Sequence, residues 1–159
     1  MRNLVLFVLT LTASATSHAA MDCSALMKFS IPEMKVVFKK AEFVPAAPPL
    51  PAHCRADGMI NERTGADGKT YGIGFAIALP SNWNSRFLFQ GGGGYNGLVR
   101  PPVGVAAVGA DPGLARGFAV VSTDTGHQSD AVFDRSYDVD QQASIDFACG
   151  NCRWASARW

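Results

Sequence analysis

Runs of apolar residues predict five β-strands, separated by segments rich in Gly, Pro and Asn. Residues 34–44 (MKVVFKKAEFV) mix β-branched and basic side chains and predict an extended strand, and residues 54–60 predict its return. Residues 71–79 (YGIGFAIAL) alternate large and small side chains, as a half-buried strand does. A short strand is predicted at 86–90 (RFLFQ). Residues 117–122 (GFAVVS) are continuously apolar, which indicates a strand buried on both faces.

Helical patterns are fewer. Residues 22–31 predict a short helical turn, and residues 110–116 predict a short helix. Residues 140–148 (DQQASIDFA) predict the start of a longer helix, with Asp140 near its N-terminus, where a carboxylate suits the helix dipole. The sequence CGNCRWASARW at 149–159 shows no sustained periodicity of apolar residues. We therefore expect the helical pattern to fail after 148 and the rest to form a divergent tail.

The first residues have the three parts of a cleaved secretory signal. Residues 1–3 (MRN) give a positive start, residues 4–11 (LVLFVLTL) form an apolar run, and residues 17–19 (SHA) place small side chains where a signal peptidase cleaves. The apolar run is too short to span a bilayer. We expect residues 1–19 to be a signal peptide, cleaved after Ala19 or one residue later, and the mature chain to be periplasmic or secreted. No membrane span is predicted after it.

Export would place the four cysteines in an oxidising compartment, where cysteines can pair. Cys23, just inside the mature start, and Cys54 make a plausible disulfide, one of three pairings that four cysteines allow. Cys149 and Cys152 have the C-x-x-C spacing of a redox or zinc half-site. No second pair or suitable histidine follows, so no metal site is predicted and no function is assigned to that pair.

Composition excludes some partners and limits the size of the domain. The formal net charge of +1 points to no polyanionic partner, and no basic patch with interleaved aromatics suggests nucleic-acid binding. The mature part, about 140 residues, has room for one modest domain or part of a larger one. The sequence does not indicate an oligomeric state.

Four consecutive glycines, Gly91–Gly94, end an apolar strand and form the most informative candidate site. Glycines let a backbone approach a ligand closely and turn its N–H groups into a pocket. A phosphate cradle fits poorly, because no Lys-Ser/Thr ending and no G-x-G-x-x-G motif accompanies the run. An oxyanion hole fits better, since α/β-hydrolases place such a loop after an early central strand. A loop without function is the third alternative.

A second candidate site, the segment STDTGH at 122–127, follows the last predicted strand. The carboxyl ends of strands face the ligand crevice in open α/β sheets. Asp124 and His127 could form an acid–base or metal pair, but one Asp and one His are too few ligands for a dedicated metal site. We therefore interpret them mainly as polar residues that fix the loop by hydrogen bonds, and secondarily as binding residues.

A serine nucleophile is missing from the motifs of this sequence. No G-x-S-x-G occurs, and that sharp strand-to-helix turn is what exposes the nucleophile in α/β-hydrolases. After the predicted signal, histidine occurs only at His53 and His127, and His53 lies in a proline-rich section. A complete Ser-His-Asp triad within these residues is not expected.

Taken in order, these motifs resemble the tannase and feruloyl esterase family of secreted α/β-hydrolases. The resemblance covers roughly residues 23–148 and implies an α/β fold for residues 20–148: an incomplete α/β-hydrolase sheet with its N-terminal strands and first helices, without the lid and the C-terminal half. The segments that carry it are LPAHCR (50–55), IALPSNWNSRFLFQGGGGYNG (77–97), GLARGFAVVSTDTGH (113–127) and DQQASIDFA (140–148).

The resemblance implies a serine carboxylic-ester hydrolase that acts on small aromatic esters. In this family the nucleophile lies in a G-C-S-x-G turn, the acid and base follow much later, and a large lid usually holds calcium. All of these lie beyond residue 148, so no cofactor is expected in this chain. Cys23 and Cys54 match early cysteines that the family tends to bridge.

The resemblance also assigns roles to the two candidate sites. Gly92 or Gly93 would supply an N–H of the oxyanion hole, with the choice between them open. Asp124 and His127 match the family's strand-end motif, where we expect a structural role near the site.

Because the resemblance stops in mid-helix, we interpret the chain as a truncated or frame-shifted copy that is inactive alone. Removing one triad member already costs several orders of magnitude in rate. A partial sheet would also expose an unpaired edge and an apolar face, so aggregation is expected. The alternative is a small secreted module that uses the glycine loop to bind an aromatic ester without catalysis.

Overall fold

The computed structural model describes residues 22–32, 34–105 and 110–156, with side chains described up to Cys149. The predicted signal peptide, residues 1–19, lies outside the described residues. Among the helices that are described, none has the length and apolar character that a membrane span requires.

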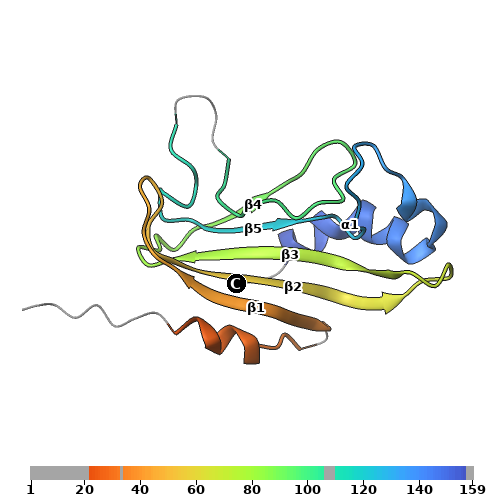
Figure 1. The fold of residues 1–159 in the computed structure, drawn as a ribbon, viewed down its shortest axis with the longest axis horizontal. Coiled ribbons are helices and arrows are strands. Elements are labelled where there is room, and N and C mark those ends of the chain that lie inside the picture. The colour runs from red at the N-terminus through yellow and green to blue at the C-terminus, as the bar shows by residue number, and fades with distance from the viewer. Residues whose placement is uncertain (1–21, 33, 106–109, 157–159) are drawn as a thin grey trace, which may run out of the picture.

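A five-stranded mixed sheet forms the body of the molecule (Figure 1). Its first three strands make an antiparallel meander, the last strand in sequence pairs antiparallel with the third, and the fourth pairs parallel with the last. In spatial order the strands are β1 (Val36–Val44), β2 (His53–Thr64), β3 (Thr70–Pro80), β5 (Ala119–Thr123) and β4 (Phe87–Gln90).

All five predicted strands are present. β2 continues to Thr64, beyond the predicted end at residue 60, because its second half still pairs with the start of β3 after a register shift. β3 is buried along most of its length rather than half-buried. β5 is buried at every position, as its continuous apolar sequence predicted.

Apolar side chains form a separate cluster on each face of the sheet. Ile73 and Phe75 belong to one cluster, and Ala78 belongs to the other, consistent with the alternation of side chains along β3. The loop between β4 and β5 packs Leu114 and Val103 against the Ala78 face. The short 3₁₀ helix η1 (Cys23–Lys28) lies beside β1 on the opposite face (Figure 1).

The predicted disulfide between Cys23 and Cys54 is present and ties η1 to β2. Both cysteines are buried, and their Cα atoms lie 5.4 Å apart. Asp22 caps η1 by accepting a hydrogen bond from the N–H of Ser24 at 3.0 Å. The helical turn predicted at 22–31 is therefore confirmed in its central part.

The predicted helix near residue 140 is α1 (Gln141–Ser156). Asp140 is its N-cap, because its Oδ1 accepts the N–H of Ala143 at 2.8 Å. The expected failure of the helix after residue 148 is wrong, since α1 continues to Ser156. The tail contains no proline before Ser156, and one interior glycine costs a helix only about 1 kcal/mol.

The helix predicted at residues 110–116 does not form, and turns occupy residues 113–117 instead. Two N–H groups of this segment form hydrogen bonds outside it. Gly113 donates to the carbonyl of Gly104 at 2.8 Å, and Leu114 donates to the carbonyl of Val103 at 3.0 Å. These long-range bonds replace the local ladder that a helix requires.

Candidate functional site

The two candidate motifs meet at one edge of the sheet. β4 and β5 run parallel, with Gln90 in register with Ser122, so both strands end at the same level. The glycine loop follows β4, and the segment with Asp124 and His127 follows β5. This is the edge at which open α/β sheets bind their ligands.

The glycine loop is fixed to β5 by Asn96, which the sequence did not single out. The side-chain N–H of Asn96 donates to the carbonyl of Thr123 at 2.5 Å. A Cβ built on Gly92 would lie 2.1 Å from Oδ1 of Asn96, so no side chain fits at Gly92 without moving that amide. Gly93 is different, because nothing lies within 4 Å of a Cβ built there.

A small cavity of about 170 Å³ opens beside this loop. Among the described residues, the N–H groups of Gly92 and Gly93 donate no hydrogen bond. Backbone N–H groups that point at a ligand position can stabilise a developing oxyanion. The cavity is lined by Gly92, Gly93, Tyr95, Asn96, Thr125 and Phe147.

Asp124 is a buried hydrogen-bond acceptor that joins β3 to the loop after β5. Its carboxylate accepts from the N–H of Gly74 at 3.0 Å, the N–H of Gly126 at 2.9 Å and the amide nitrogen of Gln128 at 2.6 Å. Burial raises the pKa of Asp124 to about 6, although these three hydrogen bonds act to lower it. The carboxylate therefore fixes the loop conformation through three donors.

His127 is also buried, with 1% of its surface exposed, and both ring nitrogens are closed off from solvent. Its ring makes edge contacts with Tyr137 (centroids 4.9 Å apart) and Phe147 (6.2 Å). Burial lowers the pKa of His127, whereas the charge of Asp134 and a hydrogen bond with the backbone of Asp134 act to raise it. No hydrogen bond joins His127 to Asp124, so the acid–base pair considered from the sequence does not form.

No serine is paired with a histidine in the part of the chain that the structure describes. The hydroxyl of Ser122 donates to the carbonyl of Arg100 and lies within β5 rather than at a turn. Nδ1 of His53 lies 2.9 Å from the carbonyl oxygen of Pro51, and this contact orients the imidazole ring. Neither arrangement resembles an activated nucleophile.

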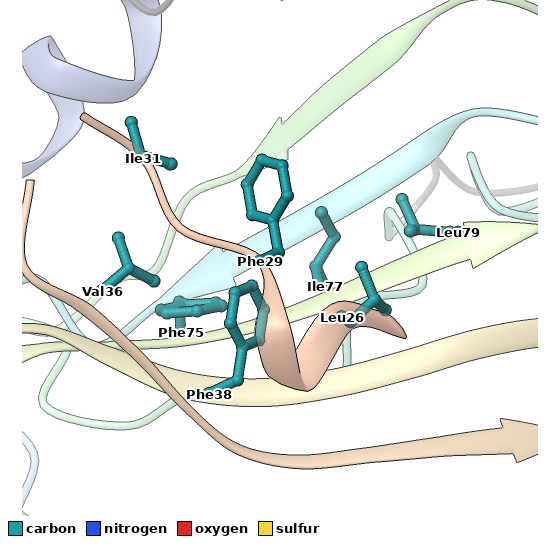
Figure 2. Close-up of a pocket in the computed structure, with 8 residues that line it drawn as sticks. All are labelled: Leu26, Phe29, Ile31, Val36, Phe38, Phe75, Ile77 and Leu79. Carbon is teal, nitrogen blue, oxygen red and sulfur yellow. The ribbon is translucent and has the colours of Figure 1, made fainter. Parts of the chain in front are cut away.

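A separate apolar cavity of about 230 Å³ lies between η1 and the sheet (Figure 2). Figure 2 shows side chains from η1, β1 and β3 converging on it. All of its lining residues are apolar, so it can accommodate apolar groups but offers no side chain for catalysis. They are Leu26, Phe29, Ile31, Val36, Phe38, Phe75, Ile77 and Leu79.

The described residues contain no group of three or more His, Cys, Asp or Glu side chains that could hold a metal ion. Cys149 is an exposed free thiol. The side chain of Cys152 lies outside the described residues, so a role for the C-x-x-C pair stays untested.

Comparisons with known proteins match one family model and several hydrolases. The model of the family "Tannase and feruloyl esterase" matches residues 54–154, somewhat past residue 148, where we expected the resemblance to end. Mono(2-hydroxyethyl) terephthalate hydrolase of Piscinibacter sakaiensis is 38% identical over 108 residues, which are 64% of this chain and 18% of that protein. An uncharacterized esterase of Agrobacterium fabrum is 29% identical over 147 residues, 84% of this chain and 26% of that protein.

The fold also has a solved counterpart. An esterase from Aspergillus oryzae superposes with a TM-score of 0.53 at 20% identity, over 83% of this chain and 27% of that one. The five-stranded mixed sheet is therefore part of an α/β-hydrolase-like esterase fold. The chain spans about a quarter or less of the curated relatives that it matches. By the extent of the family match, the chain belongs to the tannase and feruloyl esterase family.

Proposed function

We propose that this chain provides the oxyanion-binding part of an exported serine carboxylic-ester hydrolase. The observation that carries the proposal is the glycine loop, in which Gly92 and Gly93, whose N–H groups donate no hydrogen bond among the described residues, line a cavity where the parallel strands end. Ester hydrolysis develops negative charge on the carbonyl oxygen, and preorganised backbone N–H groups stabilise that charge. The nucleophile must come from outside these residues, because the sequence contains no G-x-S-x-G turn.

The substrate that we propose is a small aromatic carboxylic ester. Phe147 and Tyr95 line the glycine-loop cavity and provide aromatic surface next to the N–H groups. The terephthalate ester named for the Piscinibacter relative also carries an aromatic ring. A feruloyl ester is the corresponding substrate for an enzyme of the feruloyl esterase type.

Export of the protein is supported by the disulfide between Cys23 and Cys54, because disulfides persist in oxidising compartments. The expected signal peptide at residues 1–19 would direct the chain there. We therefore propose a periplasmic or extracellular location.

The proposal is tested by comparing two proteins in one assay with methyl ferulate and p-nitrophenyl acetate. The mature chain alone should give no rate above a buffer blank, because it lacks the triad. A chimera that replaces the matching segment of the Piscinibacter hydrolase with residues 54–148 should hydrolyse the ester. In that chimera Gly93→Pro, which removes one N–H, should lower kcat about 10²–10³-fold, as loss of an oxyanion donor does.

Gly91→Pro in the same chimera is the matched control and should keep most of the rate, and thermal unfolding should show that both variants are folded. If Gly93→Pro keeps its rate, Gly93 does not supply an oxyanion-hole N–H and the proposal fails at that residue. A rate in the isolated chain that disappears with Ser122→Ala or His127→Ala would also contradict the proposal. An inactive chimera, combined with methyl ferulate binding by the isolated chain, would favour the alternative of a non-catalytic ligand-binding module.

A further inference from the structure

The glycine loop ends in four consecutive residues with a left-handed backbone. Gly94, Tyr95, Asn96 and Gly97 have φ angles of 66°, 63°, 56° and 77°. Glycine adopts this conformation readily, but a bulky residue such as Tyr95 adopts it only at an energetic cost. Strained residues of this kind persist only where surrounding contacts hold them, and they cluster at active sites and ligand-binding loops.

Backbone hydrogen bonds hold this turn against the segment that follows β5. The N–H of Gly97 donates to the carbonyl of Asp124 at 3.1 Å, and the N–H of Phe133 donates to the carbonyl of Gly94 at 2.9 Å. Phe133 is itself left-handed, with a φ angle of 64°. The rings of Tyr95 and Phe133 meet edge to face, with their centroids 5.3 Å apart and their planes at 77°.

The Tyr95–Phe133 pair is open to solvent, although both rings have large apolar surfaces. Tyr95 is 43% exposed and Phe133 is 66% exposed. Tyr95 lines the glycine-loop cavity together with a second aromatic residue, Phe147. The ring of Phe147 is stacked on Tyr137, with centroids 4.1 Å apart and planes at 8°. The more accessible aromatic surface at this cavity is therefore that of Tyr95, which Phe133 supports.

The volume of the glycine-loop cavity limits what it can hold. At about 170 Å³ it is smaller than typical ligand pockets of roughly 300–1,000 Å³. If the carbonyl oxygen of an ester lies at the N–H groups of Gly92 and Gly93, the rest of the molecule must extend out of the cavity. Tyr95 both lines the cavity and is exposed, so it offers a surface for the part of the ester that extends.

We propose that Tyr95, held in place by Phe133, binds the aromatic ring of the ester and thereby selects aromatic over aliphatic acyl groups. This inference rests on the proposed function and adds the residue that determines selectivity. Aromatic rings pack on one another in offset or edge-to-face geometry, and this interaction adds to the effect of burying their area. An alkyl chain lacks it, so the two classes of ester should differ in affinity.

The test is an NMR titration of the mature chain with methyl ferulate and with methyl butyrate, which share the methyl ester and differ in the acyl group. The ring signals of Tyr95 should shift saturably with methyl ferulate and not with methyl butyrate. Tyr95→Leu should weaken binding of methyl ferulate about two- to tenfold, whereas Tyr95→Phe should retain it. Phe133→Leu should also weaken binding, because Tyr95 loses the ring that it packs against.

Trp83→Leu is the matched control, because Trp83 is a 60% exposed aromatic residue that does not line the cavity. It should leave the affinity for methyl ferulate unchanged. The proposal is overturned if methyl ferulate causes no saturable shift at Tyr95. It is also overturned if wild type and Tyr95→Leu bind methyl ferulate equally.

The chimera with the Piscinibacter hydrolase separates this inference from the proposed function. There, Tyr95→Leu should lower the ratio of kcat/KM for methyl ferulate to kcat/KM for methyl butyrate. Gly93→Pro should lower both values and leave their ratio unchanged. If Gly93→Pro keeps its rate while Tyr95→Leu changes the ratio, only the oxyanion role fails. If Tyr95→Leu lowers both values equally, Tyr95 is structural, and this inference fails while the proposed function stands.

Discussion

At the scale of single residues, Asp124 is where burial and hydrogen bonding oppose each other. The carboxylate has three donors, yet burial dominates and raises its pKa from 3.8 to about 6. The folded protein therefore binds a proton at Asp124 more tightly than the unfolded chain does. The stability that follows is fully present below pH 4 and is lost as the pH rises through 6.

We predict that the free energy of unfolding of the wild-type protein, measured relative to that of the Asp124→Asn variant, falls by about 3 kcal/mol at most between pH 4 and pH 7. His127 acts in the opposite sense, because its lowered pKa makes its contribution fall as the pH drops below 6.5. Taking the difference between wild type and Asp124→Asn removes this contribution, since both proteins contain His127. Urea denaturation at several pH values provides the measurement, and parallel curves for the two proteins would contradict the prediction.

The sequence indicated the glycine loop, Asp124 and His127, because glycine runs and strand-end polar residues are local signals. It did not indicate Asn96, whose position against Gly92 and the carbonyl of Thr123 exists only once β4 and β5 lie side by side. The same holds for the ring of His127, which lies against Tyr137 and the backbone of Asp134. Whether a buried imidazole has a partner depends on side chains distant in sequence, and no local pattern records that.

At the scale of elements, Arg63 connects β2 to α1. Its Nη1 lies 2.8 Å from Oδ2 of Asp146, and its Nη2 lies 3.2 Å from Oδ1 of the helix cap Asp140. Asp146 is 4% exposed, so its charge depends on this pairing and on the amide of Gln142 at 3.1 Å. The guanidinium thus holds the first turns of the helix against the sheet.

We predict that Arg63→Met lowers the free energy of unfolding by about 3 kcal/mol, because it leaves a buried carboxylate without its cation. Lys39→Met is the control: it removes an ion pair with Glu62 of similar length, 3.1 Å, between partly exposed side chains, and it should cost about 1 kcal/mol or less. Urea denaturation gives both values, and amide hydrogen exchange should show lost protection in α1 for Arg63→Met alone. Equal costs for the two variants would show that the Arg63 pairs do not hold the helix.

The strands were predictable and the helix boundaries were not, for a physical reason. Strand patterns depend on side chains that alternate between two faces, which the sequence shows directly. The segment 110–116 has some helical character, but its N–H groups bond to Val103 and Gly104 across the loop. The segment 149–156 has a poor pattern, yet it extends a helix that is already nucleated and capped at Asp140, and propagation is far less costly than nucleation.

At the scale of the whole molecule, the two faces of the sheet are covered unequally. The loop between β4 and β5 packs on the face that contains Ala78 and Val120. The face that contains Phe75 is covered only in part by η1, and Phe87 and Phe89 remain half-buried there. Figure 2 shows the cavity that remains between η1 and this face. Part of the exposed apolar surface that we expected from a partial sheet thus lies on this face.

This asymmetry predicts where an apolar dye binds. The cavity in Figure 2 should bind 8-anilinonaphthalene-1-sulfonate, because the dye reports accessible apolar surface and every side chain lining this cavity is apolar. Phe29→Ser removes an aromatic ring from the cavity and should reduce the dye fluorescence several-fold. Phe43→Ser is the matched control, since Phe43 is exposed to the same 49% as Phe29 but does not line the cavity.

The two serine variants remove equal exposed apolar surface, so comparing them distinguishes dye binding in the cavity from dye binding to exposed apolar surface in general. If both reduce the dye fluorescence equally, the dye binds apolar surface wherever it is exposed, and the cavity has no special role. If only Phe29→Ser does, binding is concentrated beneath η1. Size-exclusion chromatography of the same variants then tests whether this face also drives self-association, which an apolar face that is only partly covered should promote. In that case Phe29→Ser, and not Phe43→Ser, should shift the protein towards the monomer.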